Sequence, residues 1–173
     1  TGDLEKALQI SSPGRIAVKP DGAALVISGN TVVAAAGDKV APFIADHLEA
    51  PSGIALDKDG NVYVANCGKL QNVSVFGPDG KYVRSIGKEG GRPRVGRYDS
   101  AGMLEPGGAA IDKNGKLWVA ETLDSPKRVS VWDAKTGAFE KEFFGGSAYA
   151  TWVWMDPKHS DEVYCHNVLW KVD

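Results

Sequence analysis

Three polar residues end short apolar segments of one pattern, and their side chains are the first candidates for chemistry. Asn66 follows VYVA, Glu121 follows LWVA and Asn167 follows VYCH. Carboxylate and amide oxygens, with arginines nearby, are typical of sites for cations or polar small molecules. The candidate ligand-binding residues are therefore Asn66, Glu121, Arg128, Asn167, Arg92, Arg94, Arg97 and Trp152.

Each candidate also has a purely structural interpretation. Asn and Asp side chains commonly satisfy backbone groups in loops, and arginines can pair with an acid such as Glu121. Trp152 takes the place of Ile54 in an earlier segment, on a strand that would line a central channel. Trp118 takes the place of Tyr63, and this equivalence predicts packing between sheets. The binding and structural interpretations both stay open at this stage.

A repeated pattern of short strands must position these residues. Between Glu105 and Trp132 the sequence predicts strands over 109–112, 116–120 and 128–132. The turn Lys113-Asn114-Gly115 lies between the first two, because Asn and Gly accept the positive φ that two-residue hairpin turns need. Related segments occupy 13–48, 50–87, 105–146 and 149–173.

The repeat defines a fold class. Equivalent turn positions recur about every 38 to 55 residues, at Lys19, Asp57, Asp112 and Asp156. Four short strands per period, with turn residues at fixed offsets, are typical of propeller blades. The sequence predicts an all-β propeller of about four four-stranded blades in one domain, either an incomplete ring or a fragment of a larger one.

The two ends of the repeat raise the question of closure. TGDLEK at the start matches KTGAFEK near residue 135, so Leu4–Ile10 is predicted to be the outer strand of a preceding blade. A helix is the alternative, because Leu, Glu, Lys, Ala and Gln all favour helices. The segment 1–10 could complete the last blade and close the ring. Excision from a longer propeller, or an incomplete ring, is favoured over closure.

One long insertion, Gly87–Leu104, separates the second and third repeats. It is rich in Gly and Arg and has no strand periodicity. Loops of this length are often functional or mobile. Tyr98 lies beside the arginines, an arrangement that some RNA-binding surfaces use for stacking.

Composition limits the function classes. The chain has 173 residues, a net charge of −2 and 43% hydrophobic residues. A negative chain with one basic loop makes nucleic acid an unfavoured partner, and no apolar run approaches the ~18 residues of a membrane span. Cys67 and Cys165 fall two blades apart and are predicted to be free thiols. The chain begins at Thr1, which leaves export open, and a periplasmic or extracellular location is favoured.

The segments PSGIALDKDGNVYVAN and VSVFGPDGKYVRSIG resemble the NHL repeat, and so do GGAAIDKNGKLWVAE and KRVSVWDAKTG. The resemblance covers about residues 51 to 146 well, the first repeat weakly and the last in outline. It implies a propeller that usually has six blades, so the missing blades of a parent chain, or a second copy, are expected partners. The chain is also similar in outline to large bacterial NHL-containing proteins.

The resemblance does not supply a catalytic site. Gluconolactonase-like propellers use an Asn at the positions that Ser52 and Gly107 occupy here, and neither residue is a strong metal ligand. Amidating-lyase propellers use histidines, but the three histidines here share no place in the repeat. We therefore expect no metal, no cofactor and no evident catalytic residue. The leading prediction is a module that binds a small molecule or a protein on the face formed by the second-to-third strand loops; a hydrolase or lyase is the alternative, and RNA binding the third.

Overall fold

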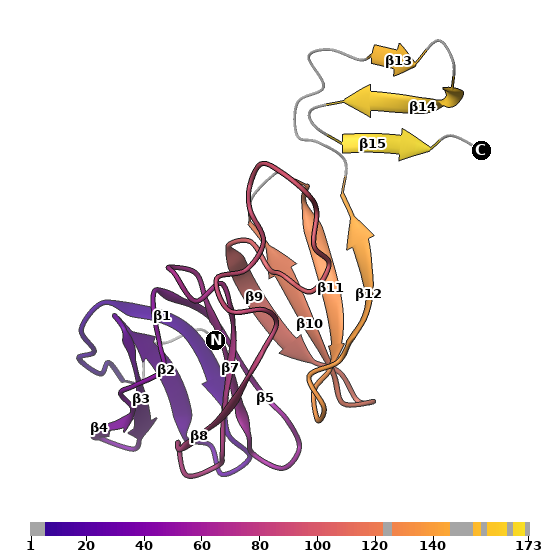
Figure 1. Cartoon of the computed structure of the whole chain (residues 1–173). Coiled ribbons are helices and arrows are strands. Elements are labelled where there is room, and N and C mark those ends of the chain that lie inside the picture. Colours follow the sequence, from indigo (N-terminus) through magenta and orange to yellow (C-terminus); the bar gives the residue numbers. More distant parts are fainter. Residues whose placement is uncertain (1–5, 123–125, 146–153, 157–158, 166–167, 172–173) are drawn as a thin grey trace, which may run out of the picture.

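The protein, seen in a computed structural model (Figure 1), is built from four antiparallel sheets, each of strands consecutive in the chain. The structure describes the backbone of residues 6–122, 126–145, 154–156, 159–165 and 168–171, and the side chains of the first two ranges. The described residues contain strands and turns and no helix. No helix in this part of the chain is therefore long and apolar enough to cross a membrane.

The strands of each sheet pair in the order in which they occur. The first sheet is β1 (Pro13–Val18), β2 (Ala24–Ser28), β3 (Thr31–Ala36) and β4 (Lys39–Ile44). The second is β5 (Pro51–Leu56), β6 (Val62–Asn66), β7 (Asn72–Phe76) and β8 (Tyr82–Ile86). The third is β9 (Pro106–Ile111), β10 (Lys116–Glu121), β11 (Arg128–Asp133) and β12 (Phe139–Phe144). The fourth is β13 (Trp154–Asp156), β14 (His159–Cys165) and β15 (Val168–Lys171).

This architecture confirms the predicted fold class: an all-β propeller-type arrangement whose incomplete last sheet fits an incomplete ring. The first three sheets lie side by side in chain order, with the inner strands β1, β5 and β9 next to one another (Figure 1). We call the end formed by the loops after β2, β6 and β10, and by the linkers between sheets, the top face. The end formed by the other turns is the bottom face.

The cores lie between neighbouring sheets. Side chains alternate along a strand, so β6 sends Val62 and Val64 toward the first sheet, and Tyr63 and Ala65 toward the third. All five residues of β6 are buried, because the second sheet has a neighbour on each face. The inner strands approach closely at Gly53, where a Cβ would lie 3.0 Å from the backbone of the third sheet.

The turns of the bottom face correct the predicted turn type. At Asp112 the turn holds three residues, with Gly115 N–H donating to Asp112 O and Asp112 N–H donating to Lys116 O. Gly115 has φ of +73°, whereas Asn114 is not among the residues with positive φ. This is a type I turn completed by a left-handed glycine. Gly60 occupies the same place after Asp57.

Two predicted elements differ from the structure. In the described part of the predicted strand Leu4–Ile10, residues 6–10 form neither strand nor helix. A strand is stabilised by its ladder of hydrogen bonds, and no described strand pairs with this segment. The predicted turn 157–161 is shorter than expected, since β14 begins at His159 and pairs that residue with Asp156.

Candidate binding site on the top face

A buried group of charges on the top face brings three of the predicted residues together. Glu121, at the end of β10, lies between two arginines: its Oε1 is 2.8 Å from Arg128 Nη1 and its Oε2 is 2.6 Å from Arg92 Nη2. All three residues are at least 93% buried. We call Arg92, Glu121 and Arg128 the charge cluster. A fully buried carboxylate requires such partners, because an unpaired buried charge is very unfavourable.

The charge cluster joins the long loop to the third sheet. Arg128 Nη1 donates to Gly102 O at 2.7 Å, and a second guanidinium nitrogen donates to Ser100 O. The backbone adds a bond from Arg92 N–H to Met103 O at 3.0 Å. The Met103 side chain is completely buried in the core between the second and third sheets. The 87–104 loop has no regular secondary structure. It is held in place by the bonds of the two arginines and by the buried Met103 side chain.

A second acid extends the network toward the surface. Glu142 of β12 has its Oε2 2.7 Å from Arg128 Nε, and the same oxygen accepts the hydroxyl hydrogen of Tyr98. Both arginines also lie over the Tyr98 ring, Arg92 at 5.3 Å and Arg128 at 5.8 Å from its centroid. Tyr98 is therefore already stacked and bonded from within the molecule.

The environment shifts the ionisation of these groups. Burial raises the pKa of the Glu121 carboxyl, and the positive charges of Arg92 and Arg128 oppose that rise. Burial also raises the pKa of Tyr98, and its bond to Glu142 adds to the rise. A carboxylate held between two arginines anchors both of them. This arrangement corresponds to the structural interpretation, in which the arginines pair with Glu121.

Asn66 lies at the equivalent place in the second sheet, where its uncharged side chain also anchors neighbouring groups. It is completely buried; its Oδ1 accepts the N–H of Glu49 at 3.0 Å, and its Nδ2 donates to Ser74 at 2.9 Å. Both bonds lie within its own sheet and the linker that precedes it. Asn66 and Glu121 therefore occupy matching positions but do not converge on one another in the contacts that the structure describes.

The other arginines of the loop point elsewhere. Arg94 and Arg97 are exposed at the tip of the loop and contribute no atom to the charge cluster. Val95 between them is 83% exposed, and Tyr98 is 41% exposed. Asn167 and Trp152, the last two predicted residues, lie outside the described residues. The structure thus brings Arg92, Glu121 and Arg128 together, and leaves Arg94 and Arg97 on the surface.

Several contributors were not predicted. Glu142 closes the network but lies on an outer strand whose sequence, FEKEFF, gives no special signal. A pocket of about 670 Å³ lies at the bottom face, between the second and third sheets. Its walls are built from the repeated turn sequences KDG and KNG, which the sequence marks as turns only. Among the described residues, no group of three or more His, Cys, Asp or Glu side chains could hold a metal ion.

Comparisons with known proteins define the fold. No protein-family model matches the sequence, and no curated protein matches it. Among solved structures, a hydrazine synthase of Kuenenia stuttgartiensis is similar over 95% of this chain and 44% of that chain, with 18% identity and a TM-score of 0.62. A structure of a nidogen/laminin complex is similar over 90% of this chain and 60% of that chain, with 17% identity and a TM-score of 0.60.

A gluconolactonase of Xanthomonas campestris is similar over 98% of this chain and 59% of that chain, with 19% identity and a TM-score of 0.57. The chain therefore spans between 44% and 60% of the length of these three solved structures. The hydrazine synthase and the gluconolactonase have propeller-type folds. At these identities the likeness establishes the fold, which is the propeller-type arrangement described above.

Proposed function

We propose that this chain is part of a propeller that binds a protein partner through the 87–104 loop. The observation that carries the proposal is the charge cluster: two buried arginines and one buried carboxylate hold a long irregular loop in one conformation. A loop that is already ordered loses less conformational entropy on binding. In this proposal Arg92, Glu121 and Arg128 act by positioning the contact surface.

The tip of the loop has the composition of a contact surface. It exposes Arg94, Val95, Arg97 and part of Tyr98. Arginine and tyrosine are enriched among the residues that contribute most to protein interfaces. The nearby outer strand adds Phe144, 46% exposed, whose ring meets that of Tyr98 edge-on at 5.9 Å. The two exposed arginines favour an acidic partner surface.

We also propose that the blades are of the NHL type, because the two segments that resemble that repeat occupy equivalent structural positions. PSGIALDKDGNVYVAN spans β5 and β6, and GGAAIDKNGKLWVAE spans most of β9 and all of β10. Tyr63 and Trp118 take the same place in the two, and each donates a hydrogen bond to the Asp that begins its turn. The nidogen/laminin structure offers a similar fold in a complex between proteins.

The test is photo-crosslinking from the loop tip. A photoreactive phenylalanine analogue replaces Val95 in the full-length protein, in the cells that produce it, with Lys39 on the first sheet as the control position. We expect one discrete protein adduct from position 95, lost in an Arg94→Glu/Arg97→Glu variant. An adduct removed by ribonuclease, or equal labelling from both positions, would overturn the proposal.

A hydrolase or lyase is the second candidate. It is favoured by the similarity to a gluconolactonase over 98% of this chain. Such an activity would draw on residues beyond those that the structure describes. Calorimetric titration of the full-length protein with a divalent metal ion tests it, because a site with several carboxylate or amide ligands gives saturable binding heat.

A further inference from the structure

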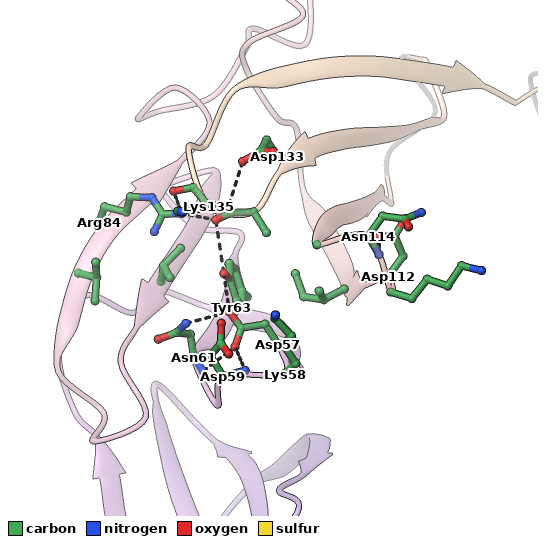
Figure 2. Close-up of a pocket in the computed structure, with 16 residues that line it drawn as sticks. Asp57, Lys58, Asp59, Asn61, Tyr63, Arg84, Asp112, Asn114, Asp133 and Lys135 are labelled. Carbon is green, nitrogen blue, oxygen red and sulfur yellow. Dashed lines mark hydrogen bonds between the residues drawn. The ribbon is translucent and has the colours of Figure 1, made fainter.

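The pocket of about 670 Å³ on the bottom face has the size of a small-molecule site. It opens between the turn after β5 on one side and the turns after β9 and β11 on the other (Figure 2). The top-face cluster lies at the opposite ends of the same strands. This pocket is therefore separate from the contact surface proposed above and does not depend on it.

Three of the four carboxylates in the pocket wall are already engaged. Each accepts two backbone N–H bonds within its own turn and at least one side-chain donor: the phenol of Tyr63, the indole of Trp118, or the ammonium of Lys116. They are Asp57, Asp112 and Asp133. The turn and side-chain donors lower the pKa of the last two. Asp59, the fourth, lies exposed at the rim.

The cations of the wall are not matched in this way. Arg84 is half-buried; its Nη2 donates to the main-chain oxygens of Ala134 and Lys135, the second at 3.0 Å. Its Nε is buried and has no hydrogen-bond partner. None of the described carboxylates forms an ion pair with Arg84. Three exposed lysines also line the pocket wall without a described ion-pair partner: Lys58, Lys113 and Lys135.

The floor of the pocket is apolar. Val75 and the ring of Tyr63 are each at least 97% buried in the core and form its inner wall. Ile111 of β9 and Val83 of β8 complete it. Figure 2 shows Arg84 and Tyr63 on the second-sheet side, with Asn114 and Lys135 coming from the third sheet. A ligand that fits must therefore carry both a charged end and an apolar body.

We propose that this pocket binds a small organic oxyanion, a carboxylate or a phosphate monoester that carries an apolar group. The guanidinium of Arg84 and the ammonium groups of Lys113 and Lys135 receive the oxyanion, and the Tyr63 ring with Val75 receives the apolar body. The engaged carboxylates argue against a cation, because their oxygens already accept bonds from the turns. The chemistry that recognises the ligand comes from two sheets, so binding would also link them.

The probes are benzoate and phenyl phosphate, with neutral benzyl alcohol, cationic benzamidine and calcium chloride as comparisons. Each is titrated into isotopically labelled protein, and binding is followed by the amide resonances of Asn114 and Lys135. We expect saturable shifts with at least one anion, and the tighter anion identifies the oxyanion class. Equal or stronger binding of benzyl alcohol, benzamidine or calcium would overturn the proposal, and so would the absence of binding by both anions.

Three variants locate the binding. Lys113→Met/Lys135→Met removes two exposed charges without touching the core, and we expect the dissociation constant to rise about tenfold or more, the loss typical of charge-assisted hydrogen bonds. Arg84→Met should have at least the same effect if it folds. Arg15→Met, on the exposed β1, is the matched control and should leave binding unchanged. Unchanged affinity in the double lysine variant would contradict the proposal.

Discussion

At the scale of single residues, the chemistry of the top face depends on Glu121. Its carboxylate is the shared partner of two buried arginines that come from different parts of the chain. Breaking a buried ion pair leaves uncompensated charge, which costs more than the pair itself contributes. Glu121 is therefore the residue at which a single change should affect the loop most.

Glu121→Gln should lower the free energy of unfolding by about 3 kcal/mol, because Arg92 and Arg128 then face a neutral amide in a buried site. The measurement is urea denaturation followed by circular dichroism. Glu89→Gln, on the exposed part of the same loop, is the control, and its midpoint should match the wild type. Equal midpoints for the two variants would show that the cluster contributes no stability.

Tyr63 gives a prediction on pH. Burial, with the charge and hydrogen bond of Asp57, raises the pKa of Tyr63 from 10.0 to about 12. The unfolded chain loses this proton at lower pH than the folded chain. The stabilising contribution of Tyr63 is thus complete below pH 10 and is lost as the pH rises toward about 12.

Wild-type protein should therefore lose more stability between pH 9 and pH 11.5 than a Tyr63→Phe variant does. Urea denaturation at the two pH values gives the loss of stability of each protein. The other tyrosines and lysines are common to both, so their contributions cancel in the comparison. Parallel losses in both proteins would mean that the Tyr63 hydroxyl does not favour its protonated form in the fold.

At the scale of elements, the sequence predicted what depends on local pattern. The predicted strands 116–120 and 128–132 agree with β10 and β11 to within one residue, because alternation and flanking turn residues mark them. The segment at Lys6–Ile10 matches an outer strand by letters alone, and among the described strands none pairs with it to form the ladder that a strand requires. Equivalent sequences form equivalent elements only where equivalent neighbours exist.

The 87–104 loop is the element least accessible to sequence reasoning. Its limits and its arginines can be read from the sequence, but which arginine is buried cannot. That choice depends on the path of the chain: Arg92 meets Glu121, 29 residues away, because Met103 fixes the loop in the core. Glu142 joins through the strand pairing of β11 with β12, which periodicity alone cannot place.

Gly102 tests the packing of this loop. A Cβ there would lie 2.6 Å from the backbone nitrogen of Arg92, and backbone cannot move aside as a side chain can. Gly102→Ala should lower the free energy of unfolding by about 1–3 kcal/mol, as overpacking does. In Gly108→Ala the new Cβ would meet Ala120 at an ordinary 3.9 Å, so this control should be close to the wild type by thermal denaturation. A loop loosely attached to the sheet would tolerate both changes equally.

At the scale of the whole molecule, the sheets stabilise one another. The second sheet shares one buried core with the first and another with the third. In repeat architectures, stability depends on such nearest-neighbour interfaces. A change in the first sheet should therefore affect the unfolding of the third.

Leu25→Ala offers the test. Leu25 is fully buried between the first and second sheets, and its truncation should cost about 2–5 kcal/mol. All five tryptophans lie at residue 118 or later, so their fluorescence reports on the other end of the chain. The variant should lower the fluorescence and circular dichroism midpoints together. A fluorescence midpoint equal to that of the wild type would show that the sheets unfold independently.

The charge cluster holds the 87–104 loop in one conformation, and we propose that this conformation is the one used for contact. Hydrogen–deuterium exchange on wild type and Glu121→Gln tests it most directly, since Arg92 N–H donates to Met103 O within the loop. We expect the wild-type amides at residues 91, 92 and 102 to be protected, and the variant to lose this protection while β6 and β7 keep theirs. Rapid exchange of these loop amides in the wild type, or unchanged protection in Glu121→Gln, would show that the charge cluster does not hold the loop.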